Sequence, residues 1–267
     1  MRLSRIGVLS IALGMTACSV SKNQSTSSTN NFVADGKLWA AMWTQHAAEY
    51  KALCFQAYNT AKLRLDAALQ KNYSKPLAIV TDIDETVLDN SPNTVGQALK
   101  GKDYETEAWY NWTAKASADT IPGAAAFLKY AASKPVTVFY ITNRDEKERE
   151  ATLRNLNKYG LPNADNSHLL LKQTTSGKEP RRQEVLKTYE IVMLIGDNLS
   201  DFTSLFDKQP EENRLQGVNQ LSGSFGNKFI VLPNVLYGDW ESSLYKFNYQ
   251  LTPGQKEEII KKSLKGE

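Results

Sequence analysis

The chain has 267 residues and a formal net charge of +3, which is enough length for one sizeable α/β domain with additions or for two small ones. Hydrophobic residues make up 41% of it and charged residues 23%, which is ordinary globular composition and excludes a chain that is disordered throughout. The weak positive charge comes without a dense block of lysine and arginine, so nothing here favours binding to a nucleic acid polymer.

The beginning of the chain has the pattern of a secretory signal. Arg2 and Arg5 precede an apolar run over 6–15, which is too short to span a bilayer as a permanent helix. The string MTAC ends at Cys18 and resembles a bacterial lipobox, in which the chain is cut before the cysteine and the new N-terminus is acylated.

We therefore expect a signal peptide over 1–17, a lipid on Cys18 and a flexible Ser/Thr/Asn-rich tether over 18–31. A plain cleaved signal is the alternative. The expected location is outside the cytoplasm, on the outer membrane in a Gram-negative cell and otherwise on the cell surface. With Cys18 acylated, Cys54 has no disulfide partner and is expected to be a small core residue.

The stretch 32–70 predicts a helical addition to the main domain, as one long helix or two joined ones. Apolar and aromatic residues recur there every three or four positions, at Trp39, Trp43, His46, Tyr50, Leu53, Ala57, Ala61 and Leu65. His46 lies in this stripe, and a core histidine is a more natural interpretation than a metal ligand.

Beyond it, short β-branched or apolar runs alternate with helical patterns. The runs that predict strands are 77–81, 136–141, 168–171, 191–195 and 229–232. Helices are expected over 122–132, 145–159 and 179–189. Such alternation is typical of βαβ units with a parallel sheet, and ligands of these sheets bind beyond the carboxyl ends of the strands.

Two carboxylates follow the first predicted strand. Asp82 and Asp84 lie two residues apart at the end of an extended segment, so both can point into the crevice. Close carboxylates resist joint ionisation, which favours one anionic nucleophile and one proton donor. An acidic turn that caps a helix is the alternative interpretation.

Further polar residues lie near the ends of later strands. Thr142 and Asn143 follow the second strand, where a hydroxyl and free backbone N–H groups can hold phosphate oxygens. Lys172 and Lys178 precede the fourth strand, and either could supply a point charge for phosphate.

Asp197 and Asp201 follow the fourth strand and suit a hard, oxygen-ligated cation such as Mg²⁺. The chain thus contains an acid pair, a threonine, a lysine and a second acid pair, in this order. This order resembles the motifs of the haloacid dehalogenase-like (HAD) superfamily. Longer strings resemble the class C acid phosphatases, the 5′-nucleotidase lipoprotein e family: IVTDIDETVLDNSP (79–92), FYITNRD (139–145), GDNLSDF (196–202) and FIVLPNVLYGDW (229–240).

The resemblance implies an α/β, HAD-like Rossmannoid fold, a three-layer αβα sandwich with a parallel sheet. One acid phosphatase domain would occupy 32–267, with a small helical cap insertion over about 90–121 and the N-terminal helical addition. The implied activity is Mg²⁺-dependent hydrolysis of phosphomonoesters, nucleoside 5′-monophosphates among them, through an aspartyl-phosphate.

Roles carried over by matching position make Asp82 the nucleophile and Asp84 the general acid and base. Thr142 and the backbone at Asn143 would hold the phosphoryl oxygens together with Lys178, which matches the family lysine better than Lys172.

The same resemblance assigns Mg²⁺ to side-chain oxygens of Asp82 and Asp197 and to the backbone carbonyl of Asp84. Asp201 would act on the metal through water.

The insertion is rich in aromatic residues, at Tyr104, Trp109, Tyr110 and Trp112. By resemblance, Trp109 and Tyr237 would clamp a base or a phenyl leaving group. Packing between cap and core is the competing interpretation for each of them.

A surface lipoprotein that binds nucleotides or haem with little catalysis is the alternative function. A phosphotransferase or a dehalogenase is a third reading, although a dehalogenase has no need of the proton that Asp84 would supply. The expected partners are a small phosphomonoester and, through the lipid, a membrane. The preferred ester is left open, as is assembly into a homodimer.

Overall fold

The computed structural model describes residues 31–267; the expected signal peptide, Cys18 and all but the last residue of the tether lie outside the described residues. Five strands form one parallel sheet in the order β5-β4-β1-β6-β7. Their bounds are β1 Leu77–Thr81, β4 Val136–Ile141, β5 Leu169–Leu170, β6 Glu190–Gly196 and β7 Phe229–Val231. All five predicted strands are confirmed, and β1 occupies the centre.

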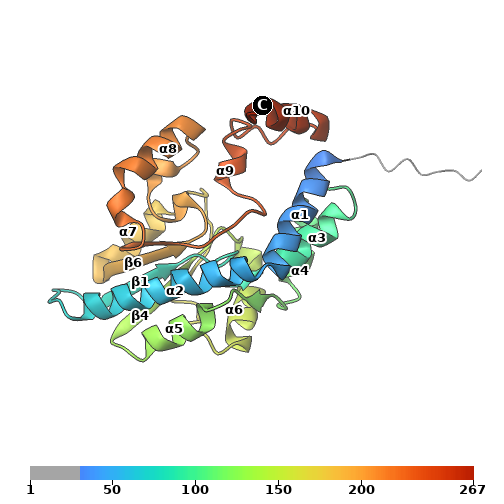
Figure 1. Cartoon of the computed structure of the whole chain (residues 1–267). Coiled ribbons are helices and arrows are strands. Elements are labelled where there is room, and N and C mark those ends of the chain that lie inside the picture. Colours follow the sequence, from blue (N-terminus) through green and yellow to red (C-terminus); the bar gives the residue numbers. More distant parts are fainter. Residues whose placement is uncertain (1–30) are drawn as a thin grey trace, which may run out of the picture.

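Helices cover both faces of the sheet (Figure 1). The strand β1 is buried along its whole length, so its alternating side chains enter two separate cores. Ile79 packs in the core that includes side chains of α2 (Ala48–Leu69) and α5 (Ala124–Ala132). Val80 packs in the other, with Val185 of α7 (Glu179–Thr188). The predicted three-layer sandwich is confirmed.

The predicted N-terminal helical stretch forms two helices, α1 (Phe32–His46) and α2. They meet at Ala47, whose extended backbone (φ −72°, ψ 123°) interrupts the helix without a glycine or proline. The buried positions of α2 are Tyr50, Cys54, Tyr58, Ala61 and Leu65.

The expected apolar stripe is therefore wrong at several positions. Trp39 is 70% exposed and Leu53 is 43% exposed. His46 is exposed at the end of α1, so the interpretation of it as a core histidine is also wrong. Because the helix breaks at Ala47, α1 packs against α3 and α10 while α2 packs against the sheet. A single apolar periodicity therefore could not describe both helices. The expectation for Cys54 is confirmed, since it is fully buried.

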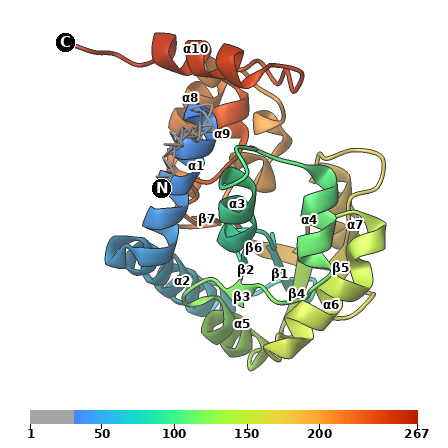
Figure 2. The same ribbon diagram turned by 90° about the vertical axis from the view of Figure 1, so that its right-hand side faces the viewer.

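The insertion begins after β1 and is closed by a short antiparallel pair, β2 (Leu88–Asp89) with β3 (Asp119–Thr120). It contains two helices, α3 (Ser91–Ala98) and α4 (Thr106–Thr113). Figure 2 shows α3 beside α1 and α4 on the side of α6 (Arg149–Lys158). The helix expected over 145–159 is this α6, preceded by a 3₁₀ turn at Glu146–Glu148.

Several elements that the sequence patterns did not predict complete the molecule. They are α8 (Glu211–Gln220), α9 (Asp239–Ser242), α10 (Pro253–Ser263) and 3₁₀ turns at Leu199–Asp201, Ser204–Phe206 and Ser222–Ser224. The last helix, α10, packs on α1, so the two ends of the domain meet (Figure 2). Within the described part of the chain, no helix combines the length and the apolarity needed to cross a bilayer.

Candidate active site

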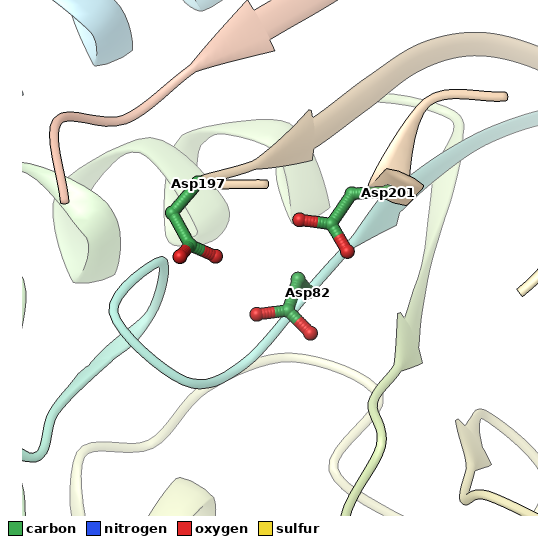
Figure 3. A group of neighbouring side chains, drawn as sticks. All are labelled: Asp82, Asp197 and Asp201. Atoms are coloured by element: carbon green, nitrogen blue, oxygen red, sulfur yellow. The ribbon is translucent and has the colours of Figure 1, made fainter. Parts of the chain in front are cut away.

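Three carboxylates converge at the carboxyl end of the central strands (Figure 3). Asp82 directly follows β1, Asp197 directly follows β6, and Asp201 lies in the 3₁₀ turn after β6. One oxygen from each lies within 4.8 Å of the others. Hard oxygen donors at this spacing suit a divalent cation, so the sequence-derived pairing of Asp82 with Asp197 has a structural basis.

Local geometry fixes the position of Asp201. The side chain of Asn198 accepts from the backbone N–H of Asp201, while Asp201 Oδ2 accepts from the N–H of Asn198 at 3.0 Å. A side chain at residue 196 would overlap the carboxylate of Asp201. Gly196 is therefore required for the turn to bring Asp201 back against the end of β6.

Burial dominates the electrostatics of Asp82 and Asp197. It raises the pKa of Asp82 to about 7, with the charge of Lys178 opposing the rise and those of Asp201 and Asp84 adding to it. Burial, followed by the charges of Asp201 and Asp82, raises the pKa of Asp197 well above its usual value. A bound cation would relieve this crowding of negative charge, so the site fits a divalent metal.

Lys178 is the lysine that reaches the site. Its ammonium lies 2.6 Å from Asp201 Oδ1 and also contacts Asp82 Oδ1. Burial alone would lower the pKa of Lys178, yet these two carboxylates raise it above the ordinary lysine value. Lys172 instead pairs with Asp145 at 2.7 Å on the partly exposed surface, so the structure brings Lys178 and not Lys172 to Asp82.

Asp84 lines the same cavity as the carboxylate cluster and is held by polar contacts of its own. Arg144 donates to it from Nη2 at 2.7 Å and from Nε at 3.0 and 3.2 Å. Asn90 donates to it at 2.9 Å, and the Thr142 hydroxyl lies 3.4 Å away. The sequence motif contained Arg144 but gave it no role. Arg144 follows β4 and Asp84 follows the neighbouring strand β1, and the sequence does not indicate that the two side chains meet.

The other predicted phosphate contacts differ in accessibility. Thr142 is fully buried, and its hydroxyl accepts from the backbone N–H of Arg144 at 3.2 Å. Asn143 lines the cavity above the carboxylates, and its side-chain oxygen accepts from Arg181 at 2.8 Å. The two residues are therefore beside Asp84 and at the cavity wall, respectively.

A cavity of about 920 Å³ opens over the carboxylates, and both residues proposed as an aromatic clamp line it. Trp109 comes from α4, and its indole N–H donates to Glu148 at 3.0 Å. Tyr237 comes from the loop after β7, and its hydroxyl contacts the carboxylate of Glu85. Among the other insertion aromatics, Trp112 donates to Asn90 at 2.8 Å and packs against the core.

Sequence reasoning missed two further polar residues of the site. Glu85 is buried in the left-handed backbone region (φ 58°), and burial raises its pKa well above the usual value. Asn234 donates to Asp197 at 2.7 Å and to the Tyr237 carbonyl at 3.0 Å. The quoted strings contained both residues, but only the fold shows that they join the loop after β7 to the acidic cluster.

Comparison with known proteins agrees with this geometry. The model of the HAD superfamily, subfamily IIIB (acid phosphatase), matches residues 9–240. A solved structure of the class C acid phosphatase from Bacillus anthracis is 45% identical, with a TM-score of 0.85, over 88% of this chain and 99% of that one. A structure of the Bacillus anthracis enzyme with tungstate bound is 44% identical, with a TM-score of 0.85, over 89% of this chain and 99% of that one.

Proposed function

The chain belongs to subfamily IIIB of the HAD superfamily and acts as a class C acid phosphatase, a phosphomonoesterase, and on this basis we propose that it hydrolyses its esters through an aspartyl-phosphate on Asp82. The observation that carries the mechanism is the position of Asp82 at the end of β1, on the wall of the cavity, in contact with Lys178. A lipoprotein that only binds nucleotides or haem would not require a carboxylate at this position.

In the first step, an oxygen of Asp82 attacks phosphorus, and the bond from phosphorus to the leaving oxygen breaks. Asp84 donates its proton to that oxygen, so the alcohol leaves neutral. Thr142, Asn143 and Lys178 are proposed to hold the phosphoryl oxygens. The contacts of Arg144 with Asp84 support an orienting role for the guanidinium.

In the second step, a water molecule attacks the phosphorus of the aspartyl-phosphate. The ionised Asp84 accepts the proton of this water, the bond from phosphorus to Asp82 breaks, and inorganic phosphate leaves. Both carboxyl groups then have their starting protonation states, because Asp84 has lost one proton and regained one.

The residues proposed to hold Mg²⁺ are Asp82 and Asp197 through side-chain oxygens and Asp84 through its backbone carbonyl. The bound ion supplies positive charge that offsets the carboxylates and the phosphoryl group. Both oxygens of Asp201 are already engaged, one by Lys178 and one by the N–H of Asn198. This engagement supports action of Asp201 through water.

Nucleoside 5′-monophosphates are the proposed substrate class. The cavity volume of about 920 Å³ lies at the upper end of the range for small-molecule sites. Trp109 and Tyr237 line this cavity together with Asp82, which supports contact of the two aromatic side chains with a base while the phosphate reaches Asp82.

The test is hydrolysis of p-nitrophenyl phosphate at mildly acid pH with Mg²⁺. Asp82→Asn should lose essentially all turnover, because an amide cannot form the acyl phosphate, while Asp35→Asn, at an exposed aspartate of α1, should match the wild type. A panel of 5′- and 3′-mononucleotides, sugar phosphates and aryl phosphates would then rank substrates. Turnover insensitive to Asp82→Asn would refute the mechanism.

For the location we propose export and acylation at Cys18, with 18–31 as a tether, on the basis of the sequence alone. The outer membrane is the proposed site in a Gram-negative cell.

A further inference from the structure

The loop 232–238, between β7 and α9, carries Tyr237 to the cavity and has no regular secondary structure. The side chains of Leu232 and Leu236 are buried, and polar contacts on both sides of the loop add to this anchoring. On the inner side, Asn234 joins it to Asp197 and the Tyr237 hydroxyl contacts Glu85. On the outer side, the contact comes from the N-terminal helix α1.

Lys37 of α1 makes that outer contact. Its ammonium donates to the Leu236 carbonyl at 2.5 Å and to Glu241 Oε2 at 2.5 Å. Lys37 is only 7% exposed, although burial of a charged group is costly unless it is paired and hydrogen-bonded. It lies on the buried face of α1, among Val33, Ala34, Ala41 and Thr44.

A second ion pair extends this contact across the mouth of the cavity. Asp103, in the loop between α3 and α4, lies 3.8 Å from Lys37 and 2.6 Å from Lys256 of α10. Lys37, Asp103, Glu241 and Lys256 all line the cavity. The two ammonium groups here are balanced by two carboxylates. These four side chains therefore connect the elements that carry them and leave no excess positive charge for an additional anion.

We propose that Lys37 is a positioning residue for the substrate cavity. By tying α1 to the Leu236 carbonyl and Glu241, it holds Tyr237 in place for esters whose leaving group carries an aromatic ring. The inference rests on the contact between Tyr237 and the substrate in the proposed function. Without the Lys37 ammonium, the loop becomes ordered only when such a substrate binds, and the free-energy cost of this ordering raises KM. A small ester that contacts only the catalytic carboxylates binds without ordering the loop, so its KM does not rise.

The test compares Lys37→Met with wild type on adenosine 5′-monophosphate and on glycerol 2-phosphate. The variant should raise KM for the nucleotide by about three- to tenfold, the effect of immobilising one more side chain on binding. KM for glycerol 2-phosphate and kcat for both esters should stay within about twofold. Lys261→Met, at an exposed lysine of α10 paired with Glu257, is the matched control and should change neither.

A double variant separates positioning from general structural damage. If Lys37 acts through Tyr237, Lys37→Met should add nothing to the KM for the nucleotide in a Tyr237→Ala background. Should Lys37→Met fail to fold because Glu241 is left unpaired, Lys37→Met with Glu241→Gln removes both charges and should give the same split between substrates. Thermal unfolding checks that each variant is folded.

An equal rise in KM for both esters would overturn the inference, and so would an effect of Lys37→Met that persists in full without Tyr237. A Tyr237→Ala variant that binds adenosine 5′-monophosphate as wild type does would instead overturn the proposed aromatic contact, and the inference with it.

Discussion

Replacement of Lys178 by methionine tests how the buried carboxylates are held. The ammonium contacts both Asp82 and Asp201, and all three side chains are buried. Removal of one partner from a buried ion pair costs about 3–5 kcal/mol when the remaining charge cannot be relieved. Here the orphaned Asp82 carboxylate can take up a proton, so the cost in unfolding free energy should depend on pH.

The sign follows from the pKa of Asp82, which burial raises to about 7 from an ordinary value near 3.8. A raised carboxyl pKa means that the folded state holds a proton that the unfolded state has released, so stability falls as pH rises through this window. Without Lys178 the pKa of Asp82 rises further, and the fall continues to higher pH. We expect Lys178→Met to cost about 3 kcal/mol at pH 8 and about 1 kcal/mol at pH 5.5.

The assay is thermal unfolding in chelator at both pH values. A loss of about 3 kcal/mol corresponds to a Tm lower by roughly 6–12 °C for a chain of this size. Lys172→Met is the matched control, since its pair with Asp145 lies at the partly exposed surface and should contribute about 0–1 kcal/mol. In the phosphatase assay, Lys178→Met should lower kcat by about 10²- to 10³-fold. A pH-independent loss of stability, or an equal loss in Lys172→Met, would refute the reasoning.

Three further outcomes are expected. Because burial raises the pKa of Asp82 to about 7 and that of Asp197 well above its usual range, Mg²⁺ binding should release protons. Its affinity should weaken, as pH falls, by about tenfold per pH unit for each proton released; calorimetry in buffers of different ionisation enthalpy measures this, and pH-independent affinity would contradict it. Gly196→Ala should displace the Asp201 carboxylate and lower Mg²⁺ affinity by about 10- to 100-fold, whereas unchanged affinity would show that the turn adjusts freely. Cys18→Ser should abolish palmitate labelling of the expressed protein and release its activity from the membrane fraction, and labelling that persists would exclude acylation at this residue.

Much of the sheet was predictable because each strand is a short, mostly apolar run, and a polar residue directly follows β1, β4 and β6. The same regularity identified Asp82 after β1 and Asp197 after β6, since the carboxyl ends of parallel strands share one edge. Periodicity failed in the N-terminal helices, where the extended backbone at Ala47 changes the buried face between α1 and α2. A local pattern contains no information about which partner a helix will pack against.

The sequence by itself determined the fold class, the order of the acidic motifs and the side chains that can do phosphoryl chemistry, because these depend on residue type and short spacings. Only the tertiary structure brought Lys178 to Asp82 and Lys172 to Asp145, paired Arg144 with Asp84 and joined Lys37 to the Tyr237 loop. Each of these contacts, such as the 199 positions between Lys37 and Leu236, spans a long stretch of chain. Such pairs are selected by the packing of whole helices and strands, and no short stretch of sequence records that choice.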